Sequence, residues 1–413
     1  MDLVRIKPVI DHESRCPHCQ TPLTGYQLLW QGIHVCVAST CSGCGAEIVE
    51  DLPVGHSALV PYVVEPACDR LWGDELSKAW YGLPLLRALQ SPDPNPEVKL
   101  TVESFRPSAN VIILNCLDYL YGHSLLKLLN AAGHLSEPPD LGLVVMVQSF
   151  LRWMVPDGVA EVWVVDLPLS KAQHYYPHLD ERIQKECARF ETIYLSLALP
   201  HPADFDITSF TRVEKHNFDS SRWRITYIWR EDRPWWNPPL GYMVPLQWAR
   251  ALRLKQLVLM WQNWKVRRLF RRLRRRFPAA TFTVAGLGTA TAFPAWIEDR
   301  RTGHFTADIE VSMCRVYAES RLVIGVHGSS MLLPSAHAGM TVDLMPDGRW
   351  GNMAQDILYQ PNDLVGDDKR LLSWRYRYIP MRTPVRTLAR IIKYQLGNLR
   401  QAVLRFRAEE GLS

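Results

Sequence analysis

From about Glu103 onward, short runs of consecutive apolar residues alternate with longer segments in which apolar residues recur at helical spacing. Apolar runs of about four to eight residues between turn residues are typical of buried strands, and a period of about 3.6 residues is typical of helices. Strands that alternate with helices build a parallel sheet covered by helices. The pattern therefore predicts an α/β fold with Rossmann-like domains.

The first such domain is predicted over residues 101–215. Its expected strands are 110–118, 141–148, 160–168 and 191–199, and its expected helices are 122–135 and 180–190. His123 follows Gly122 at the start of the first helix, so it should lie at the carboxyl end of the preceding strand. Ligands of open α/β sheets bind at that edge, which makes His123 a candidate functional residue.

The second domain is predicted over residues 216–375. Its expected strands are 222–229, 282–289, 322–326 and 340–346, and its expected helices lie within 247–277 and over 308–319. Asp308 is the expected N-cap of the latter helix. An irregular segment follows to about residue 372, because it is rich in Gly, Asp and Asn. In the last segment, 376–413, a helix over 383–410 is expected to pack back across both domains.

The N-terminal segment carries two Cys-x-x-Cys pairs. Cys16 and Cys19 form the first pair and Cys41 and Cys44 the second. Two such pairs at this spacing indicate a zinc ribbon over residues 1–55, in which four thiolates hold a structural Zn²⁺ and leave no open position for catalysis. Three other residues remain alternative ligands, and an unmetallated or redox pair remains an alternative to zinc. The alternative ligands are His18, His34 and Cys36.

Residues 56–100 should connect the ribbon to the first α/β domain. Scattered Trp and Pro residues favour short helices, and the prolines of 91–97 predict a linker without regular structure.

Composition places the chain among globular proteins. Its 413 residues suffice for two or three domains, and hydrophobic and charged residues make up 47% and 22%, as in ordinary soluble proteins. The N-terminus lacks the apolar core of a signal peptide, and no apolar run reaches the ~18 residues of a membrane span, so we expect a cytoplasmic location. The nine cysteines fit a reducing compartment.

One charged segment has several interpretations. Seven arginines lie between residues 267 and 276, around an apolar stripe at helical spacing. The stripe consists of Val266, Leu269, Phe270, Leu273 and Phe277. A domain helix with a solvated basic face is the first interpretation. Peripheral contact with an anionic membrane at its inner face through 265–276 is the second, and nucleic-acid binding, which we consider unlikely, is the third.

Residues 320–346 predict a ligand site. An apolar strand ends in His327-Gly328-Ser329-Ser330, and a helix of about ten residues should follow, whose first N–H groups and positive dipole end would suit an anion. Asp343 is expected near the carboxyl end of the next strand, facing the same crevice as His327.

Two arginines at the end of another strand fit this site. Arg230 and Arg233 could hold a diphosphate from two directions, because guanidinium groups bind phosphate oxygens bidentately. A surface cluster of salt bridges with Glu231 and Asp232 is the alternative. Gly286 is a weaker candidate, since the fragment of a dinucleotide fingerprint to which it belongs lacks the third glycine.

Two consecutive Rossmann-like domains, with arginines after the first strand of the second domain, are typical of the GT-B arrangement of glycosyltransferases. Three segments, 121–131, 224–233 and 314–346, resemble the family 61 glycosyltransferases, whose second domain has an arginine-bearing strand end and an I-G-x-H-G-A-G-L turn. The chain departs from the family at three places. Ser329-Ser330-Met331 replaces Ala-Gly-Leu, Lys127 stands at an acidic position, and Asp343 replaces a glutamate.

The resemblance implies transfer of a sugar from a nucleotide-sugar donor to a hydroxyl of a glycan or another acceptor, as in polysaccharide biosynthesis. It implies that Arg230 and Arg233 neutralise the donor diphosphate, together with His327 and the N–H groups of 328–330, and that Asp343 binds a ribose hydroxyl. Fucosyl, hexosyl and pentosyl donors stay open.

Inverting transfer needs a base, for which His123 is the candidate and Asp118 the alternative. No carboxylate pair has metal-binding spacing, so we expect no catalytic metal. A nucleic-acid-binding zinc-ribbon protein and an inactive transferase-like scaffold are the competing interpretations.

Overall fold

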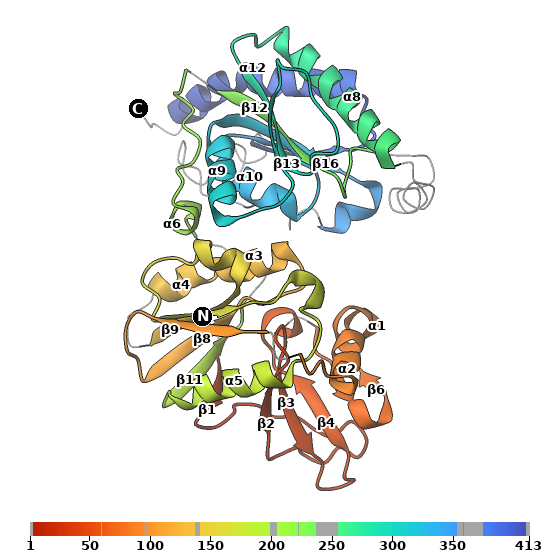
Figure 1. Ribbon diagram of the computed structural model, residues 1–413, viewed down its shortest axis with the longest axis vertical. Coiled ribbons are helices and arrows are strands. Elements are labelled where there is room, and N and C mark those ends of the chain that lie inside the picture. Colours follow the sequence, from red (N-terminus) through yellow and green to blue (C-terminus); the bar gives the residue numbers. More distant parts are fainter. Residues whose placement is uncertain are drawn as a thin grey trace. The chain divides into compact units, whose positions relative to one another are not determined.

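The computed structural model describes residues 3–58, 60–95, 98–136, 141–198, 205–221, 223–236, 255–352, 358 and 375–409. The chain divides into two compact units, Met1–Phe210 and Thr211–Ser413 (Figure 1). Both units are mixed α/β structures, as the predicted α/β class requires. Their boundary lies five residues before the predicted one at 215.

The first unit contains a six-stranded sheet in the order β1-β11-β8-β9-β10-β7. Its four central strands are parallel, and β1 and β7 pair with it in antiparallel fashion at the two edges. The strands are β1 (Leu3–Lys7), β7 (Leu100–Ser104), β8 (Asn110–Asn115), β9 (Gly142–Gln148), β10 (Glu161–Val165) and β11 (Thr192–Ser196). The helices are α3 (Tyr121–Leu129), α4 (Ala131–Ser136), η4 (Ser149–Met154), η5 (Leu169–Lys171), α5 (Pro177–Ala188) and α6 (Ile207–Thr211).

The N-terminal segment belongs to two different sheets. Strand β1 pairs with β11, so it is part of the α/β sheet and not of the ribbon predicted over 1–55. The ribbon continues beyond residue 55, because a five-stranded antiparallel sheet runs in the order β2-β3-β4-β5-β6. Its strands are β2 (Gln27–Trp30), β3 (Val35–Thr40), β4 (Glu47–Asp51), β5 (Val63–Glu65) and β6 (Arg70–Trp72).

Short helices accompany the antiparallel sheet. They are η1 (Gly55–Ala58), η2 (Pro66–Cys68), α1 (Glu75–Ser77), η3 (Lys78–Gly82) and α2 (Leu83–Gln90). Leu85 and Leu86 of α2 pack with Cys36, Tyr62 and Val64 in a small core on one side of this sheet. The predicted short helices of 56–100 are therefore present, and they are packed on the ribbon sheet and do not merely connect two domains.

The second unit contains a six-stranded, fully parallel sheet in the order β14-β13-β12-β15-β16-β17. Numbered along the chain, this order is 3-2-1-4-5-6, that of a Rossmann sheet, whose direction of winding reverses between the first and fourth strands. The strands are β12 (Arg224–Arg230), β13 (Thr281–Leu287), β14 (Glu298–Thr302), β15 (Ser320–Val326), β16 (Thr341–Met345) and β17 (Tyr376–Pro380).

Helices cover both faces of this sheet (Figure 1). Helices α8 (Lys255–Arg274) and α12 (Val385–Glu409) share one core with the strands. Helices α9 (Ala307–Ala318) and α10 (Leu332–His337) lie on the other face, and two short 3-10 helices, η6 (Ser329–Met331) and η7 (Asp347–Asn352), complete the unit. The predicted separate segment 376–413 thus supplies β17 and α12 to the second unit itself. Residues 247–254 of the predicted basic-helix region lie outside the described residues.

The arginine-rich helix packs into the second unit through its apolar stripe, which agrees with each of the three interpretations of its basic face. Its apolar stripe, including Val266, Leu269, Phe270 and Leu273, is buried in the core shared with α12. Full burial of such side chains stabilises by about 1.5–3 kcal/mol each, so this stripe stays in the core. Within the described chain, no helix has the length and apolar character needed to cross a membrane.

Two helix starts differ from the prediction. Thr306, not Asp308, is the N-cap of α9, because its side chain accepts a hydrogen bond from the N–H of Ile309. The ten-residue helix expected after the turn at 327–330 is replaced by one 3-10 turn and the six-residue α10.

Candidate functional site

The point where the second sheet reverses its winding lies between β12 and β15. These strands are neighbours, with Ile228 opposite Gly325, so the residues that follow both strands emerge at one edge. Arg230 ends β12 and His327 directly follows β15. Ligands of such sheets bind at this edge, and the two predicted donor-site segments therefore meet there.

Arg233 links the two segments. Its Nη1 donates a hydrogen bond to the backbone carbonyl of His327 at 3.3 Å. The guanidinium lies against Gly328, whose φ is +153°, and a Cβ at this position would collide with it. A glycine is therefore required here for the close approach of the arginine to the turn, and Arg233 carries positive charge to the main chain of 327–330.

Arg230 is held by a neighbour in its own loop. Its Nε and Nη2 donate to the two carboxylate oxygens of Asp232 at 2.7 and 2.6 Å. Burial would raise the pKa of Asp232, but the hydrogen bonds and charge of Arg230 outweigh it and lower that pKa. Arg230 thus forms the salt bridge with Asp232 that was the alternative to diphosphate binding. An incoming phosphate would have to compete with Asp232 for the guanidinium.

Gln262 of α8, which the sequence did not single out, fixes this loop. It is fully buried, its Nε2 donates to the carbonyl of Arg230 at 3.1 Å, and its Oε1 accepts from the N–H of Trp235 at 2.6 Å. One side chain thus holds both ends of the arginine loop. Nothing in the sequence pattern distinguishes Gln262 from the polar residues around it.

His327 and Asp343 do not line an open crevice as predicted. Both side chains are fully buried, and Nδ1 of His327 lies 2.8 Å from Oδ2 of Asp343. Asp343 occupies the middle of β16, opposite Gly325, on the face where Met331 packs back onto the sheet. The pair therefore anchors the turn from beneath, and neither of its side chains is placed to meet a ligand.

The remaining residues of the turn are partly accessible. Ser329 and Ser330 begin η6 and are half-buried. Ser330 Oγ is itself shielded from solvent and has no hydrogen-bond partner in the described part of the chain.

Gly286 has a packing role in β13. Its φ is +119°, and a Cβ there would strike the carbonyl oxygen of Trp229 on the neighbouring strand. Gly288 is similar, since a Cβ would lie 2.5 Å from the Trp229 ring and 2.8 Å from a carboxylate oxygen of Glu231. Close packing of β12 and β13 accounts for both glycines, so Gly286 needs no role in donor binding.

In the first unit, three charged or titratable side chains gather after β8. Asp118 is fully buried, and its Oδ2 lies 2.9 Å from Nζ of Lys127. Its Oδ1 lies 3.4 Å from Nδ1 of His123, whose side chain is 23% exposed. Lys127 is also buried and donates to the carbonyl of Leu117 at 2.9 Å. The sequence-predicted His123 and Asp118 are thus brought together, with Lys127 as a third member.

Asp118 also organises the start of α3. Its Oδ1 accepts from the N–H of Leu120 at 3.1 Å, and its own N–H donates to Gln148, which in turn accepts from Ser124. A carboxylate that is buried and bonded in this way is poorly placed to take a proton from a substrate. Asp118 is therefore a partner of His123, and the His123 ring is the more accessible of the two side chains.

Lys127 was noted only as a departure from an acidic position. The sequence does contain a signal for a buried ion pair, because Lys127 is the single charged residue within the apolar run Leu125-Leu126-Lys127-Leu128-Leu129. Buried charges are paired, so such a lysine predicts a buried carboxylate nearby.

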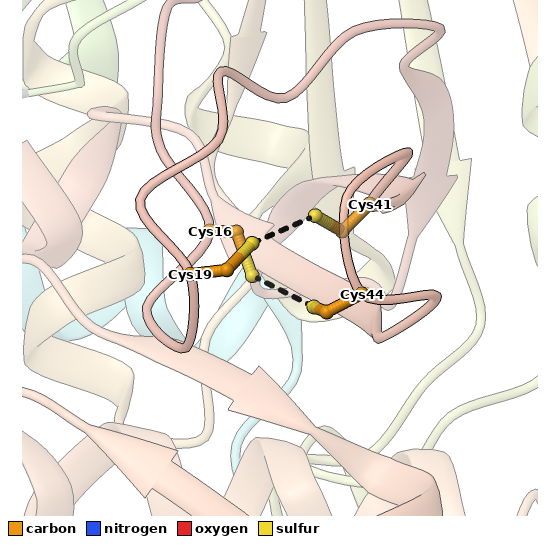
Figure 2. A group of neighbouring side chains, drawn as sticks. All are labelled: Cys16, Cys19, Cys41 and Cys44. Carbon is orange, nitrogen blue, oxygen red and sulfur yellow. Dashed lines mark hydrogen bonds between the residues drawn. The ribbon is translucent and has the colours of Figure 1, made fainter.

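The four predicted metal ligands form a cluster at the tip of the ribbon. The sulfur atoms of Cys16, Cys19, Cys41 and Cys44 all lie within 4.8 Å of one another. Figure 2 shows the two pairs pointing toward each other from two turns, with Cys16 and Cys44 sulfurs 3.6 Å apart and those of Cys19 and Cys41 3.4 Å apart. A tetrahedral site with metal–sulfur bonds of about 2.3 Å has edges of roughly 3.8 Å, so this cluster is compatible with structural zinc.

The two turns have the same backbone design. Gln20 donates its N–H to the carbonyl of Cys16 at 2.9 Å, and Gly45 donates to Cys41 at 2.8 Å. Both residues have positive φ, of 65° and 74°. Hydrogen bonds with Thr21 lower the pKa of the Cys19 thiol to about 6, whereas at Cys44 a backbone hydrogen bond from Ala46 is outweighed by burial and the neighbouring sulfurs, which raise the pKa of that thiol to about 12. The thiolate form is therefore favoured at Cys19.

The alternative ligands are engaged elsewhere. His18 contacts Glu65 through Nε2 at 2.9 Å and stands edge-on to Trp72. His34 lies 2.7 Å from Asp51, and Cys36 also contacts Asp51, in a separate buried cluster. The four-cysteine set is therefore the ligand set that the structure supports.

Comparison with known proteins supplies no relative from which a role for these sites could be taken. No protein-family model, curated protein or solved structure matches this chain.

Proposed function

We propose that this protein is a metal-independent, inverting glycosyltransferase of GT-B arrangement, similar to family 61, that uses a nucleotide-sugar donor. The observation that carries the proposal is the meeting of Arg230, Arg233 and the turn at 327–330 at the winding reversal of a 3-2-1-4-5-6 sheet. Such an edge is where nucleotides bind in Rossmann sheets.

The donor would be held by its diphosphate. When the sugar–phosphate bond breaks, negative charge builds up on the departing nucleoside diphosphate. Arg233, already fixed on the carbonyl of His327, and Arg230, on a loop held by Gln262, would stabilise that charge without rearrangement. Phosphate binding would draw Arg230 away from Asp232, so the ion pair serves as a resting partner for the guanidinium.

The acceptor hydroxyl would be deprotonated by His123. Asp118 Oδ1 lies 3.4 Å from Nδ1, and a carboxylate on that side favours the tautomer with the proton on Nδ1 and the lone pair on Nε2. Lys127 keeps the carboxylate in place through its ion pair. Deprotonation and attack on the sugar carbon would then invert the configuration at that carbon.

The cysteine cluster would hold zinc as a structural ion. Four thiolates close a tetrahedral site and leave no position for a substrate. When bound, the ion would supply folding free energy to the ribbon, which has only a small core of its own.

The test is a thermal-shift screen of the full chain with UDP-, GDP-, CMP- and dTDP-sugars. A ligand that binds only the folded state at roughly 100 times its Kd stabilises by about 2.7 kcal/mol, which is a rise of several degrees in Tm. We expect one nucleotide class to produce this rise, and the Arg230→Gln variant to weaken its binding by about tenfold to a hundredfold.

Arg300→Gln is the matched control, because Arg300 lies in the same sheet and also bonds a carboxylate two residues away, at 2.6 Å. It should bind like the unmodified protein. His123→Gln should keep the thermal shift and lose release of nucleoside diphosphate in the presence of acceptor. Absence of any shift with all four nucleotide classes would refute the proposed function.

A further inference from the structure

The outward face of α8 gathers large apolar side chains at the surface. Leu257, Met260, Trp261 and Trp264 are 60, 58, 45 and 41% exposed, and their spacing of three or four residues puts them on one face. The Trp261 and Trp264 rings stack with centroids 4.9 Å apart. Contiguous exposed apolar side chains of this kind mark an interaction surface.

The same face continues as a basic surface. Helix α8 contains two lysines and five arginines and no acidic residue, whereas the whole chain has a net charge of only +5. Arg268, Arg271 and Arg275 follow Trp264 at the same spacing and are exposed. No salt bridge joins the arginines of α8 to an acidic residue of the described chain. The guanidinium of Arg268 lies 4.9 Å over the Trp264 ring and joins the two halves of the face.

Helix α12 extends this surface. It packs against α8 (Figure 1). Arg386, Arg390 and Tyr394 are exposed on it. Its residues 385–398 include no Asp or Glu. The two helices therefore present cations, indoles, a phenol and aliphatic side chains together.

We propose that this surface docks on an anionic lipid bilayer. Arginines are attracted to the negative charge of lipid headgroups, and Trp and Tyr side chains favour the boundary between headgroups and acyl chains. The exposed Leu257 and Met260 favour a lipid partner over a nucleic acid. Burial of aliphatic side chains in the acyl region strengthens binding, whereas contact with a phosphate backbone does not bury them. The inner face of α8 is buried in the core, so docking uses the folded helix as it stands.

The test is sedimentation of the full chain with vesicles. Phosphatidylcholine vesicles are compared with vesicles containing roughly one third phosphatidylserine. We expect binding to the anionic vesicles alone, and release at about 0.5 M salt. Trp261→Ser/Trp264→Ser should weaken binding about tenfold at unchanged charge, and Arg268→Glu/Arg271→Glu/Arg275→Glu about a hundredfold. No sugar nucleotide is present, so the result is independent of the proposed transferase activity.

The control carries the same change of charge elsewhere. Lys171→Glu/Arg182→Glu/Lys185→Glu alters three exposed cations of the first unit and should bind vesicles like the unmodified protein. Circular dichroism and thermal melting check that each variant is folded. Three outcomes overturn the proposal: equal binding to both vesicle types, anionic-vesicle binding by the tryptophan variant as tight as that of the unmodified protein, or no vesicle binding. In the last case, arginine-dependent binding of a DNA or RNA probe would identify the surface as a nucleic-acid site.

Discussion

Replacing Lys127 by Met should strongly destabilise the first unit. The substitution keeps most of the aliphatic stem and removes the ammonium group that lies 2.9 Å from the carboxylate of Asp118. Both side chains are buried, so the carboxylate would be left without its cation in a site closed to water. Breaking one side of a buried ion pair costs about 3–5 kcal/mol, and we expect Lys127→Met to fall in this range.

The double variant separates the pair from the rest of the site. Asp118→Asn/Lys127→Met removes both charges and keeps an oxygen that can accept from the N–H of Leu120. The carbonyl of Leu117 would still lose its bond from Lys127, a cost of about 1–3 kcal/mol. We therefore expect the double variant to be more stable than either single variant, since the charges are no longer unpaired.

Equilibrium urea denaturation of the full chain measures these differences, and hydrogen exchange of peptides from 110–129 assigns the transition to the first unit. Lys78→Met is the matched control. Lys78 pairs with Glu75 at 3.0 Å, close to the 2.9 Å of the Lys127–Asp118 pair, but this pair lies in solvent, so its loss should cost less than about 1 kcal/mol. A cost below about 1 kcal/mol for Lys127→Met, or a double variant as unstable as the sum of the singles, would refute the buried-pair reasoning.

Local periodicity explains why much of the fold could be predicted. The predicted strands are apolar runs in the interior of the two α/β sheets, so each could be recognised from its own residues without knowledge of its neighbours. They are β8 to β11, β12, β13, β15 and β16. The strands that were missed are mostly at the edges of sheets. Strand β14 reads Glu-Asp-Arg-Arg-Thr, and strand β1 finds its partner β11 far along the chain. Edge strands carry polar residues, and pairing across such distances leaves no local pattern.

The sequence identified the segments that form the candidate site, but it was wrong about where the side chains of His327 and Asp343 point. The order of elements correctly brings Arg230 and the turn at 327–330 to one edge. The direction of a side chain depends on strand alternation and on what covers that face, and here Met331 and the segment after it cover the face of His327 and Asp343. Because Met331 follows the same turn, it buries His327, so the residue that was predicted to contact a ligand instead holds the turn through Asp343.

Two further changes test the metal centre and a buried histidine. A chelator of Zn²⁺ should unfold the ribbon, seen as loss of protection in hydrogen exchange of residues 16–45, while Cys68→Ser, a cysteine outside the cluster, should leave metal content unchanged. Burial lowers the pKa of His216 to about 4, against about 6.5 in the unfolded chain. Its Nδ1 donates to the carbonyl of Ala318 at 2.8 Å, which raises the pKa but does not outweigh burial, so the folded state holds the neutral ring. The unfolded state then binds the proton first as pH falls, and stability should be constant above about pH 6.5 and decrease by about 3 kcal/mol toward pH 4 on account of this group. His216→Asn, whose amide can donate the same bond, should remove that part of the pH dependence, measured as the difference between the two proteins in urea denaturation across pH 4–7. Parallel curves for the two proteins would mean that His216 is not held neutral in the folded chain.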